Sequence, residues 1–328
     1  MMQANLRLNL TGGESDPLSR SVRYQTAIEM AKFADEKGFT SVNLEEHHVA
    51  ENGWLPSPLV MAGAIASITE RINIGIMALL APLYDPIRLA EDIAVIDLIS
   101  QGRFSFIAGQ GYREIEYHIS NKPYEKRGEW MDHVLDTLLK SWDDEAFEYR
   151  GKTVNVTPKP FSRPHPPFFI GGMSRPAARR AARFGLPFSP PVSNPELETY
   201  YHEQLAQYGK EGYVSCPPAN VSVLFLDEDP ESAWKDIGSY FLNEATEYGR
   251  WGTEDLERPL EIDHSNLDVL RDTGFYEIVT PEECLNRHLG NDSFYAVVHP
   301  LVGGMPIDRA WHCMELYASQ VLSKLVKG

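Results

Sequence analysis

The chain has 328 residues, of which 43% are hydrophobic and 23% charged, an ordinary composition for a folded globular protein. Its net charge of −17 opposes binding to nucleic-acid phosphates and to anionic membranes. Its three cysteines form no C-x-x-C pair, which argues against a disulfide framework or structural zinc, and no signal peptide or membrane span stands out. We therefore expect a cytoplasmic protein without nucleic-acid or membrane partners.

Short strand patterns alternate with longer helical patterns along the chain. Strands are expected at residues 4–10, 39–44, 72–80, 103–109, 167–172, 186–190, 220–227 and 293–301. Helical patterns follow at residues 21–38, 57–72, 85–102, 127–142, 174–185, 194–209, 229–245 and 306–325. Eight strands, each followed by a helix, predict a (β/α)8 TIM barrel forming one domain over residues 1–328. An open doubly wound sheet fits less well, because no G-x-G-x-x-G follows the first strand.

Two segments interrupt this alternation. Residues 143–167 are expected to be an insertion that contains a small hairpin around Gly151. Residues 248–276 are polar, acidic and only weakly periodic, and a long irregular segment in a compact domain is often functional or mobile. We predict that residues 248–276 form a mobile lid loop.

The stretch "LEEHHVAENG" places Glu46, His47 and His48 directly after the second strand, at the end of a barrel where active sites lie. Adjacent residues on an extended segment point to opposite sides, so the two histidines do not readily share a metal ion, and no metal site is expected. One histidine can face the barrel mouth and act as an acid or base. The alternative is that both are structural or surface side chains.

The stretch "FFIGGMSRPAARRAARFG" runs from a buried strand through Gly171 and Gly172 into a helix that begins near Ser174. Glycines allow close approach of the backbone, and a helix start offers unpaired N–H groups with a partial positive charge. Together they predict a phosphate seat to which Arg175 can add charge. A plain strand–turn–helix junction is the alternative. We interpret the neighbouring residues 179–180, both arginine, as a solvated helix face.

The fourth strand ends in Gly109, Gln110 and Gly111, which form either a tight turn or a place where a flat ligand approaches the backbone. The third strand ends in small and apolar residues, which on composition are core. The sequence contains no H-E-x-x-H, G-x-S-x-G or G-x-x-x-x-G-K-[ST] motif. The pair His312 and Cys313 lies in the last helix, too far from the strand ends for a nucleophile pair.

These stretches, with "IGIMALLAPLYDPIRLAEDIAVIDLISQGRFSFIAGQG" and "VTPEEC", resemble the bacterial luciferase-like flavin-dependent monooxygenase family over nearly the whole chain. The resemblance implies a barrel, usually dimeric, that binds reduced FMN or the deazaflavin F420. It also implies a separate NAD(P)H flavin reductase that supplies the reduced FMN.

The resemblance also implies roles for individual residues. His47 matches the histidine near the reactive edge of the flavin that serves as general acid/base, and Glu46 supports its loop. The Met77–Ala78 bond matches a non-proline cis peptide that supports the flavin ring. The phosphate would sit on the amides of Met173 and Ser174.

The remaining cofactor residues implied by the resemblance are Gly109, Gln110, Gly172 and Arg175. Gln110 stands where bacterial luciferase has an arginine that grips the phosphate, and Gly109 stands where it has a reactive cysteine. The pocket therefore resembles that of luciferase without matching it, and we do not expect light emission.

The expected activity is oxygenation of a small apolar organic substrate, such as an aldehyde or ketone, by a C4a-peroxyflavin formed from reduced FMN and O2. The substrate pocket is expected to include Trp54, Leu80, Tyr112 and Phe188. An F420-dependent oxidoreductase on the same fold and a non-catalytic flavin-binding protein are the alternatives.

Overall fold

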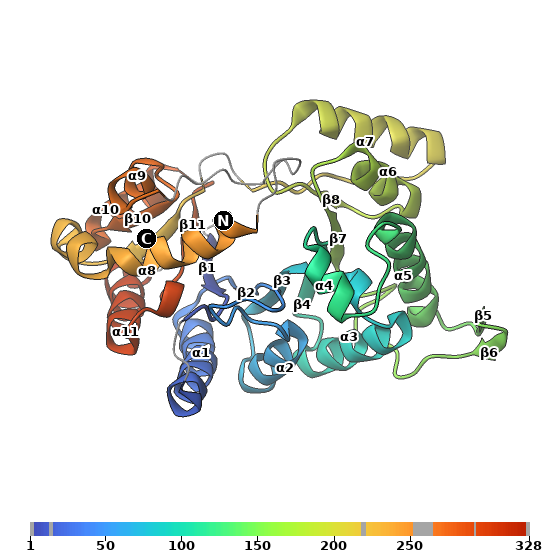
Figure 1. The fold of residues 1–328 in the computed structure, drawn as a ribbon, viewed down its shortest axis with the longest axis horizontal. Coiled ribbons are helices and arrows are strands. Elements are labelled where there is room, and N and C mark those ends of the chain that lie inside the picture. Colours follow the sequence, from blue (N-terminus) through green and yellow to red (C-terminus); the bar gives the residue numbers. More distant parts are fainter. Residues whose placement is uncertain (1–2, 13–15, 218–220, 252–264, 292, 326–328) are drawn as a thin grey trace. The chain divides into compact units, whose positions relative to one another are not determined.

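In the computed structural model of the chain, residues 3–12, 16–217, 221–251, 265–291 and 293–325 are described. Their contacts divide the chain into two units. Unit 1 comprises Met1–Pro56, Ile68–Ile72 and Pro218–Gly328, and unit 2 comprises Ser57–Ser67 and Asn73–Pro217. Both units are built from parallel strands connected through helices (Figure 1).

In the described part of unit 1, parallel strands lie in the order β10, β9, β11, β1, β2. Their bounds are β1 Gln3–Leu8, β2 Ser41–Leu44, β9 Val223–Leu226, β10 Tyr276–Val279 and β11 Tyr295–Val298. Leu6 pairs with Val42 on one side and Val298 on the other, and all three side chains are fully buried. Such apolar strands are typical of a parallel sheet that is covered on both faces.

The helices of unit 1 are α1 Pro17–Lys37, α8 Pro230–Arg250, α9 Leu267–Asp272, α10 Pro281–Gly290, α11 Ile307–Leu316 and α12 Ser323–Leu325. A 3-10 helix lies at η2 Val302–Gly304 and a π-helix at η3 Tyr317–Leu322. Helix α1 begins after Asp16, whose carboxylate accepts a hydrogen bond from Ser19 N at 2.9 Å, and ends at Gly38 with φ +88°. Both ends follow from local chemistry, a side-chain cap and a residue that tolerates the left-handed region.

In unit 2 the strands are β3 Asn73–Leu79, β4 Phe104–Ala108, β7 Phe168–Gly171 and β8 Phe188–Ser189, in the order β3, β4, β7, β8. Phenylalanine rings fill the space beside them. The rings of Phe106 and Phe168 are stacked with centroids 4.9 Å apart. The strand ends of β4 and β7 are neighbours, because Ala108 pairs with Ile170.

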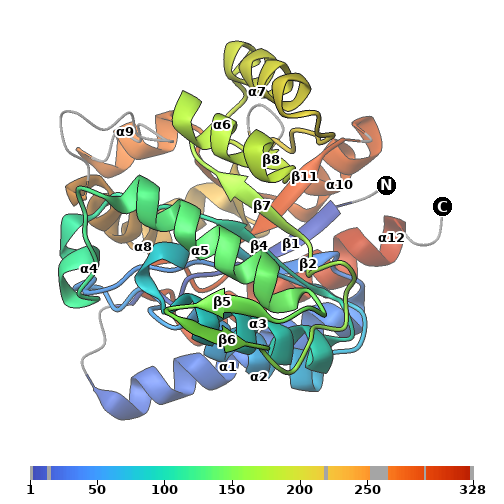
Figure 2. The same cartoon turned by 90° about the vertical axis from the view of Figure 1, so that its right-hand side faces the viewer.

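The helices of unit 2 are α2 Pro58–Ile68, α3 Pro86–Ser100, α4 Glu114–Ile119, α5 Arg127–Trp142, α6 Arg175–Phe184 and α7 Pro195–Tyr208, with a turn at η1 Ala81–Leu83. Helices α6 and α7 lie side by side (Figure 2). Strands β5 Phe147–Tyr149 and β6 Lys152–Val154 form an antiparallel hairpin that extends beyond α5 (Figure 1).

The described residues contain nine parallel strands, one more than the sequence predicts. The extra strand is β10, which begins within the segment 248–276 predicted to be an irregular lid. Residues 252–264 of that segment lie outside the described residues. At the segment's ends, α8 continues to Arg250 and α9 covers Leu267–Asp272, so the prediction of irregular structure was wrong there. A six-residue helix and a four-residue strand are too short to show a reliable period.

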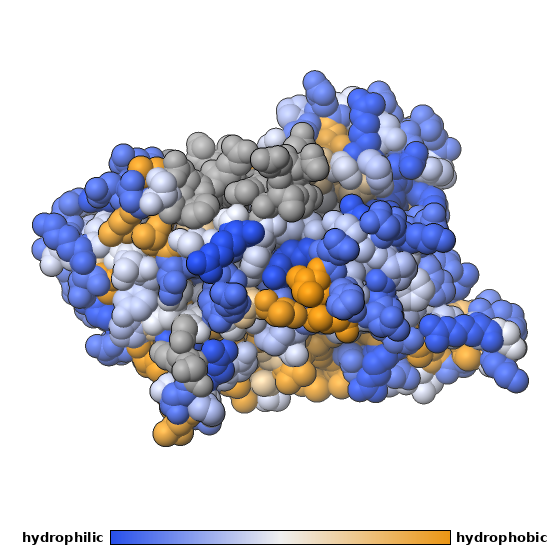
Figure 3. Space-filling model, viewed as in Figure 1, coloured by the Kyte–Doolittle hydropathy of each residue, from blue (hydrophilic) through white to orange (hydrophobic). Residues whose placement is uncertain are grey.

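The face of the molecule in Figure 3 is mostly hydrophilic, with an apolar patch over α4. Two isoleucines of that helix, Ile115 and Ile119, are 42% and 50% exposed. Within the described residues, no helix is both long enough and apolar enough to cross a membrane.

Candidate functional site

The loop after β2 carries Glu46, His47 and His48, and the structure sends the two histidines to different partners. The Nε2 atom of His48 lies 3.0 Å from Oε1 of Glu46, whose side chain is buried. The ring of His47 contacts a group of aromatic side chains instead. The divergence expected for adjacent side chains on extended backbone is confirmed.

His47 belongs to an aromatic cluster formed by His47, Trp54, Tyr248 and Trp251. The centroid of the His47 ring lies 4.5 Å from that of Trp251, 5.2 Å from that of Trp54 and 6.4 Å from that of Tyr248. The two indole rings are 5.1 Å apart. The ring of His47 thus lies among three larger aromatic rings.

Sequence reasoning identified Trp54 but missed Tyr248 and Trp251, which lie at the end of α8. The signal that could have found them is the pair of large aromatic residues in "EYGRW", where a helical pattern stops. Only the folded chain shows that this helix end meets the loop after β2.

In unit 2 the turn between β7 and α6, residues 172–175, has the geometry of an anion seat; we call it the α6 turn. Gly172 has φ +139°, and a Cβ atom added there would lie 2.8 Å from Cβ of Ala177. Ser174 caps the helix, with its Oγ accepting a hydrogen bond from Ala177 N at 3.4 Å. The turn thus requires glycine and presents the positive end of a helix, as phosphate-binding turns do.

The end of β4 lies next to this turn through the pairing of β4 with β7. Gly109 N donates to Leu79 O at 2.8 Å, and a Cβ at Gly109 would lie 2.8 Å from Cβ of Ala78. The Met77–Ala78 peptide bond is cis, as the resemblance predicts. No side chain therefore covers the backbone at the end of β4, and a side chain at Gly109 would collide with Ala78.

The cations near the α6 turn differ from those expected. The guanidinium of Arg175 lies over the Tyr200 ring, 5.1 Å from its centroid. Arg180 was predicted to lie on a solvated helix face, and this was wrong, because its side chain is only 8% exposed. It forms an ion pair with Asp132, and its Nη1 lies 3.5 Å from Oε1 of Gln110. Arg180 is therefore a buried cation beside Gln110, and its charge is paired with that of Asp132.

The residues expected to line a substrate pocket belong to both units. Trp54 lies in the aromatic cluster of unit 1. In unit 2, Leu80 packs against Tyr117, and Tyr112 accepts a hydrogen bond at its carbonyl oxygen from the Tyr124 hydroxyl at 3.1 Å. Phe188 is fully buried and stacks on Tyr201 of α7, with ring centroids 5.7 Å apart.

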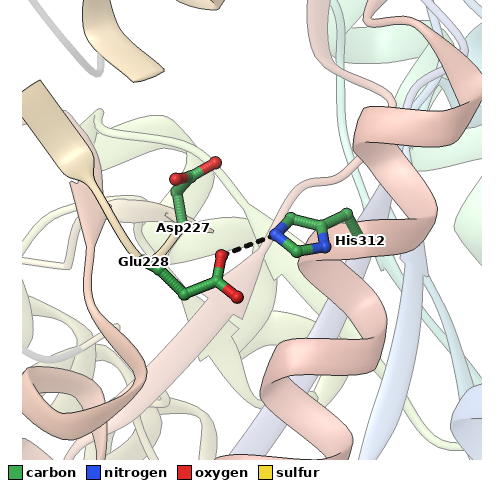
Figure 4. A group of neighbouring side chains, drawn as sticks. All are labelled: Asp227, Glu228 and His312. Atoms are coloured by element: carbon green, nitrogen blue, oxygen red, sulfur yellow. Dashed lines mark hydrogen bonds and ion pairs between the residues drawn. The ribbon is translucent and has the colours of Figure 1, made fainter. Parts of the chain in front are cut away.

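Asp227, Glu228 and His312 form a compact group of possible metal ligands within the described ranges (Figure 4). These side chains already have ionic or hydrogen-bond partners, because His312 Nε2 lies 2.7 Å from Glu228 and Arg309 Nη2 lies 2.9 Å from Asp227. The hydrogen bond from His312 lowers the pKa of Glu228. A guanidinium in this position opposes a metal cation, so we read the group as an ion-pair cluster.

Cys313, next to this group, is also not a nucleophile. It is fully buried, and its Sγ accepts a hydrogen bond from Leu226 N at 3.2 Å. Burial raises the pKa of the Cys313 thiol to about 12, which leaves it protonated at neutral pH.

Comparison with known proteins agrees with the resemblance in the sequence. The alpha chain of alkanal monooxygenase from Photorhabdus luminescens is 28% identical over 167 residues, which cover 49% of this chain and 46% of that one. The chain thus spans about half the length of the curated relatives it matches first.

Among solved structures, monooxygenase RslO1 from Streptomyces bottropensis has a TM-score of 0.73 at 21% identity, covering 99% of this chain and 100% of that one. The oxygenating constituent of 3,6-diketocamphane monooxygenase from Pseudomonas putida, a type II Baeyer-Villiger monooxygenase in complex with FMN, has a TM-score of 0.65 at 18% identity, covering 98% of each chain. These likenesses show the fold, which is the luciferase-like (β/α)8 barrel predicted from the sequence.

The family described as luciferase-like monooxygenase matches residues 7–287, most of the chain. A match over this much of the chain is sufficient to show the family. The chain belongs to the luciferase-like monooxygenase family.

Proposed function

We propose that this protein is a flavin-dependent monooxygenase that uses reduced FMN and O2 to oxygenate a small, largely apolar organic substrate, such as an aldehyde or ketone. The observation that carries the proposal is the α6 turn, an anion seat in a chain of the luciferase-like family. Family membership supports a flavin, and the solved relative from Pseudomonas putida is described in complex with FMN.

The residues of the α6 turn fit the phosphate group of FMN. Gly172 leaves the backbone open, and the amides of Met173, Ser174 and Arg175 can donate to phosphate oxygens. Pro176 has no N–H, and Ala177 N already donates to Ser174 Oγ. The chain carries a net charge of −17, so an anion has to be held by local donors against the overall field. Arg175 and the buried Arg180 supply positive charge nearby.

When bound, reduced FMN supplies two electrons, so that one atom of O2 enters the substrate and the other leaves as water. The protein itself has to bind the flavin and the substrate, exclude water from them and transfer a proton. We assign the proton transfer to the imidazole of His47, because imidazoles exchange protons near neutral pH. Glu46 keeps the loop in place by pairing with His48.

The flavin ring is assigned to the ends of β3 and β4, at Met77, Ala78, Gly109 and Gln110. Trp54, Leu80, Tyr112 and Phe188 remain the proposed substrate side chains, and their apolar character favours an apolar organic substrate. The part of the segment 248–276 between α8 and α9 remains the proposed lid.

Reduced FMN would come from a separate NAD(P)H flavin reductase, because the Pseudomonas putida relative is named as the oxygenating constituent of its enzyme. We also propose that the protein is a homodimer, which light scattering of the purified protein tests by its molar mass. We further propose that it lies in the cytoplasm.

The phosphate seat is tested by comparing FMN with riboflavin, which lacks the phosphate. Hydrogen bonds to a charged group contribute about 1.5–3 kcal/mol, so FMN should bind at least tenfold more tightly than riboflavin. Ser174→Ala should reduce this difference, whereas Ser67→Ala, at an exposed serine of α2, should not. Equal affinities for the two flavins would contradict the assignment of the seat.

The role of His47 is tested by turnover. His47→Ala should retain FMN binding and lose turnover by a factor of about 100 or more, the usual contribution of a general acid or base. His118→Ala is the matched control, because this exposed histidine of α4 lies outside the proposed site. Unchanged turnover in His47→Ala would remove His47 from the mechanism, and flavin binding without any oxygen consumption would identify a non-catalytic binder.

A further inference from the structure

A buried polar network in unit 1 involves none of the candidate site residues. Its centre is the carboxylate of Glu244 in α8, which is 1% exposed. Asn9 Nδ2 donates to this carboxylate at 2.8 Å, the Tyr276 hydroxyl donates at 3.0 Å, and Thr11 Oγ1 lies 2.9 Å away. His299, directly after β11, completes it with Nε2 at 3.0 Å. We call these residues, with Arg7, the Glu244 network.

The hydrogen bonds of His299 define its protonation state. Its Nε2 faces the Glu244 carboxylate, and its Nδ1 lies 3.0 Å from the carbonyl oxygen of Arg7. A carbonyl oxygen and a carboxylate both accept hydrogen bonds, so both ring nitrogens have to donate. Only the imidazolium form of His299 carries protons on both nitrogens, and its side chain is fully buried.

The charges in the network balance only in this form. Arg7 pairs with Glu45, and its Nη2 lies 3.5 Å from Glu244, so two carboxylates face Arg7 and His299. A neutral His299 would leave one buried negative charge without compensation, which is strongly unfavourable. Burial raises the pKa of Glu244, but His299 and Arg7 outweigh burial and hold that pKa well below its usual value. Burial and the nearby Glu244 raise the pKa of Tyr276, which keeps its hydroxyl a donor.

The network connects to His47 along helix α8. Tyr248 and Trp251 follow Glu244 by four and seven residues, so the three side chains lie along the same face of the helix. Glu244 is bonded to residues after β1 and β11, while the rings of Tyr248 and Trp251 contact the ring of His47. Glu247, which follows Glu244 by about one turn of the same helix, accepts a hydrogen bond at Oε1 from Glu51 N at 3.3 Å.

A second connection runs through the backbone. Asn9, which donates its side-chain amide to Glu244, accepts a hydrogen bond from Leu55 N at its carbonyl oxygen, at 2.9 Å. Leu55 in turn accepts at its carbonyl oxygen from His47 N at 3.2 Å. Glu244 is therefore tied both to the helix that carries the aromatic rings and to the loop that carries His47.

We propose that Glu244 and His299 are positioning residues, a buried carboxylate and imidazolium that fix the end of α8 against the loop after β2 and so hold the His47 ring in the aromatic cluster. They act through Asn9, Tyr248 and Trp251. The consequence for turnover rests on the proposed function, whereas the positioning of His47 does not.

The charge state of His299 is tested in the unaltered protein by nuclear magnetic resonance with 15N-labelled histidine. We expect one histidine with both ring nitrogens protonated at pH 7, and His299→Gln should remove that signal. A His299 signal with one unprotonated nitrogen at pH 7 would overturn the proposal without any requirement that a variant folds.

The positioning is tested by the near-ultraviolet circular dichroism signal of the close pair Trp54 and Trp251, which Trp251→Phe identifies. Glu244→Gln keeps the size of the side chain and removes its charge, and it should reduce this signal by at least half. Glu277→Gln is the matched control, because Glu277 is a partly buried carboxylate of the same unit paired with Arg287 at 2.7 Å. The signal should be unchanged in that control.

Tyr276→Phe removes one donor to Glu244 with a smaller effect on folding, and it should reduce the same signal partially. An indole signal that is unchanged in folded Glu244→Gln and Tyr276→Phe would overturn the positioning role.

In turnover with reduced FMN, Glu244→Gln should lower kcat at least tenfold with little change in KM. Absence of turnover in the unaltered protein would count against the proposed function alone, because the spectroscopic results do not depend on it.

Discussion

Gly172→Ala is the substitution whose effect the structure determines most directly. Gly172 has φ +139°, a region that residues with a side chain rarely adopt, and holding a residue there costs about 1–3 kcal/mol. The added Cβ would lie 2.8 Å from Cβ of Ala177, and overpacking of this kind costs about 1–3 kcal/mol more. We expect a loss of about 2–6 kcal/mol in the free energy of unfolding.

Unfolding in urea, followed by far-ultraviolet circular dichroism, measures this loss as a fall in the midpoint. Gly63→Ala is the matched control, because Gly63 lies within α2 and an added Cβ there would meet no atom within 4 Å. Replacing a glycine inside a helix by alanine stabilises by about 0.5–1 kcal/mol, so the two changes should move the midpoint in opposite directions.

The same pair of variants reports on the ligand. FMN at a hundred times its Kd should stabilise the unaltered protein and Gly63→Ala by about 2.7 kcal/mol. Gly172→Ala should gain less at the same FMN concentration, because a displaced α6 turn no longer presents its amides correctly. The reasoning would be refuted if Gly172→Ala unfolded at the same urea concentration as the unaltered protein and FMN stabilised both proteins equally.

Two further predictions concern protonation. Burial raises the pKa of Asp35, but hydrogen bonds from the backbone of residues 70–72 outweigh burial and hold this pKa below its usual value. The ionised carboxylate therefore stabilises the fold at any pH above its unfolded pKa of about 3.9. This stabilisation is lost as the pH falls through the lower pKa of the folded state. Asp35→Asn should therefore lower stability at pH 7 and weaken the acid dependence of unfolding, and an unchanged acid dependence would contradict this. Burial raises the pKa of the Cys284 and Cys313 thiols to about 12 each. Ellman's reagent should therefore modify only the partly exposed Cys216 in the native protein, and all three cysteines after denaturation. Rapid modification of all three in the native state would contradict the burial of Cys284 and Cys313.

Local signals in the sequence predict much of the fold, because they depend on neighbouring residues. Asp85 and Pro86 mark the start of α3, and Gly185 marks the end of α6 with φ +68°. The alternation of strand and helix patterns is enough to predict the barrel class. The same reasoning missed β10, because a four-residue strand that follows a six-residue helix gives no clear period.

The candidate site was predictable only where its chemistry is local. The α6 turn is visible in the sequence because Gly172, Ser174 and the helix start are consecutive. Arg180 was misassigned to a solvated face because its burial depends on Asp132 of α5, which the sequence does not bring near it. The pairing of Glu244 with His299 likewise exists only once α8 packs against the end of β11.

The central claim is that this chain uses reduced FMN to insert oxygen into an organic substrate. The most direct measurement supplies pre-reduced FMN, 18O2 and a panel of aliphatic aldehydes and ketones to the purified protein, with reduced F420 in a parallel reaction. The account predicts oxygen uptake with FMN and one 18O atom in the product. Binding of F420 alone, with hydride transfer to the substrate and no oxygen uptake, would contradict it.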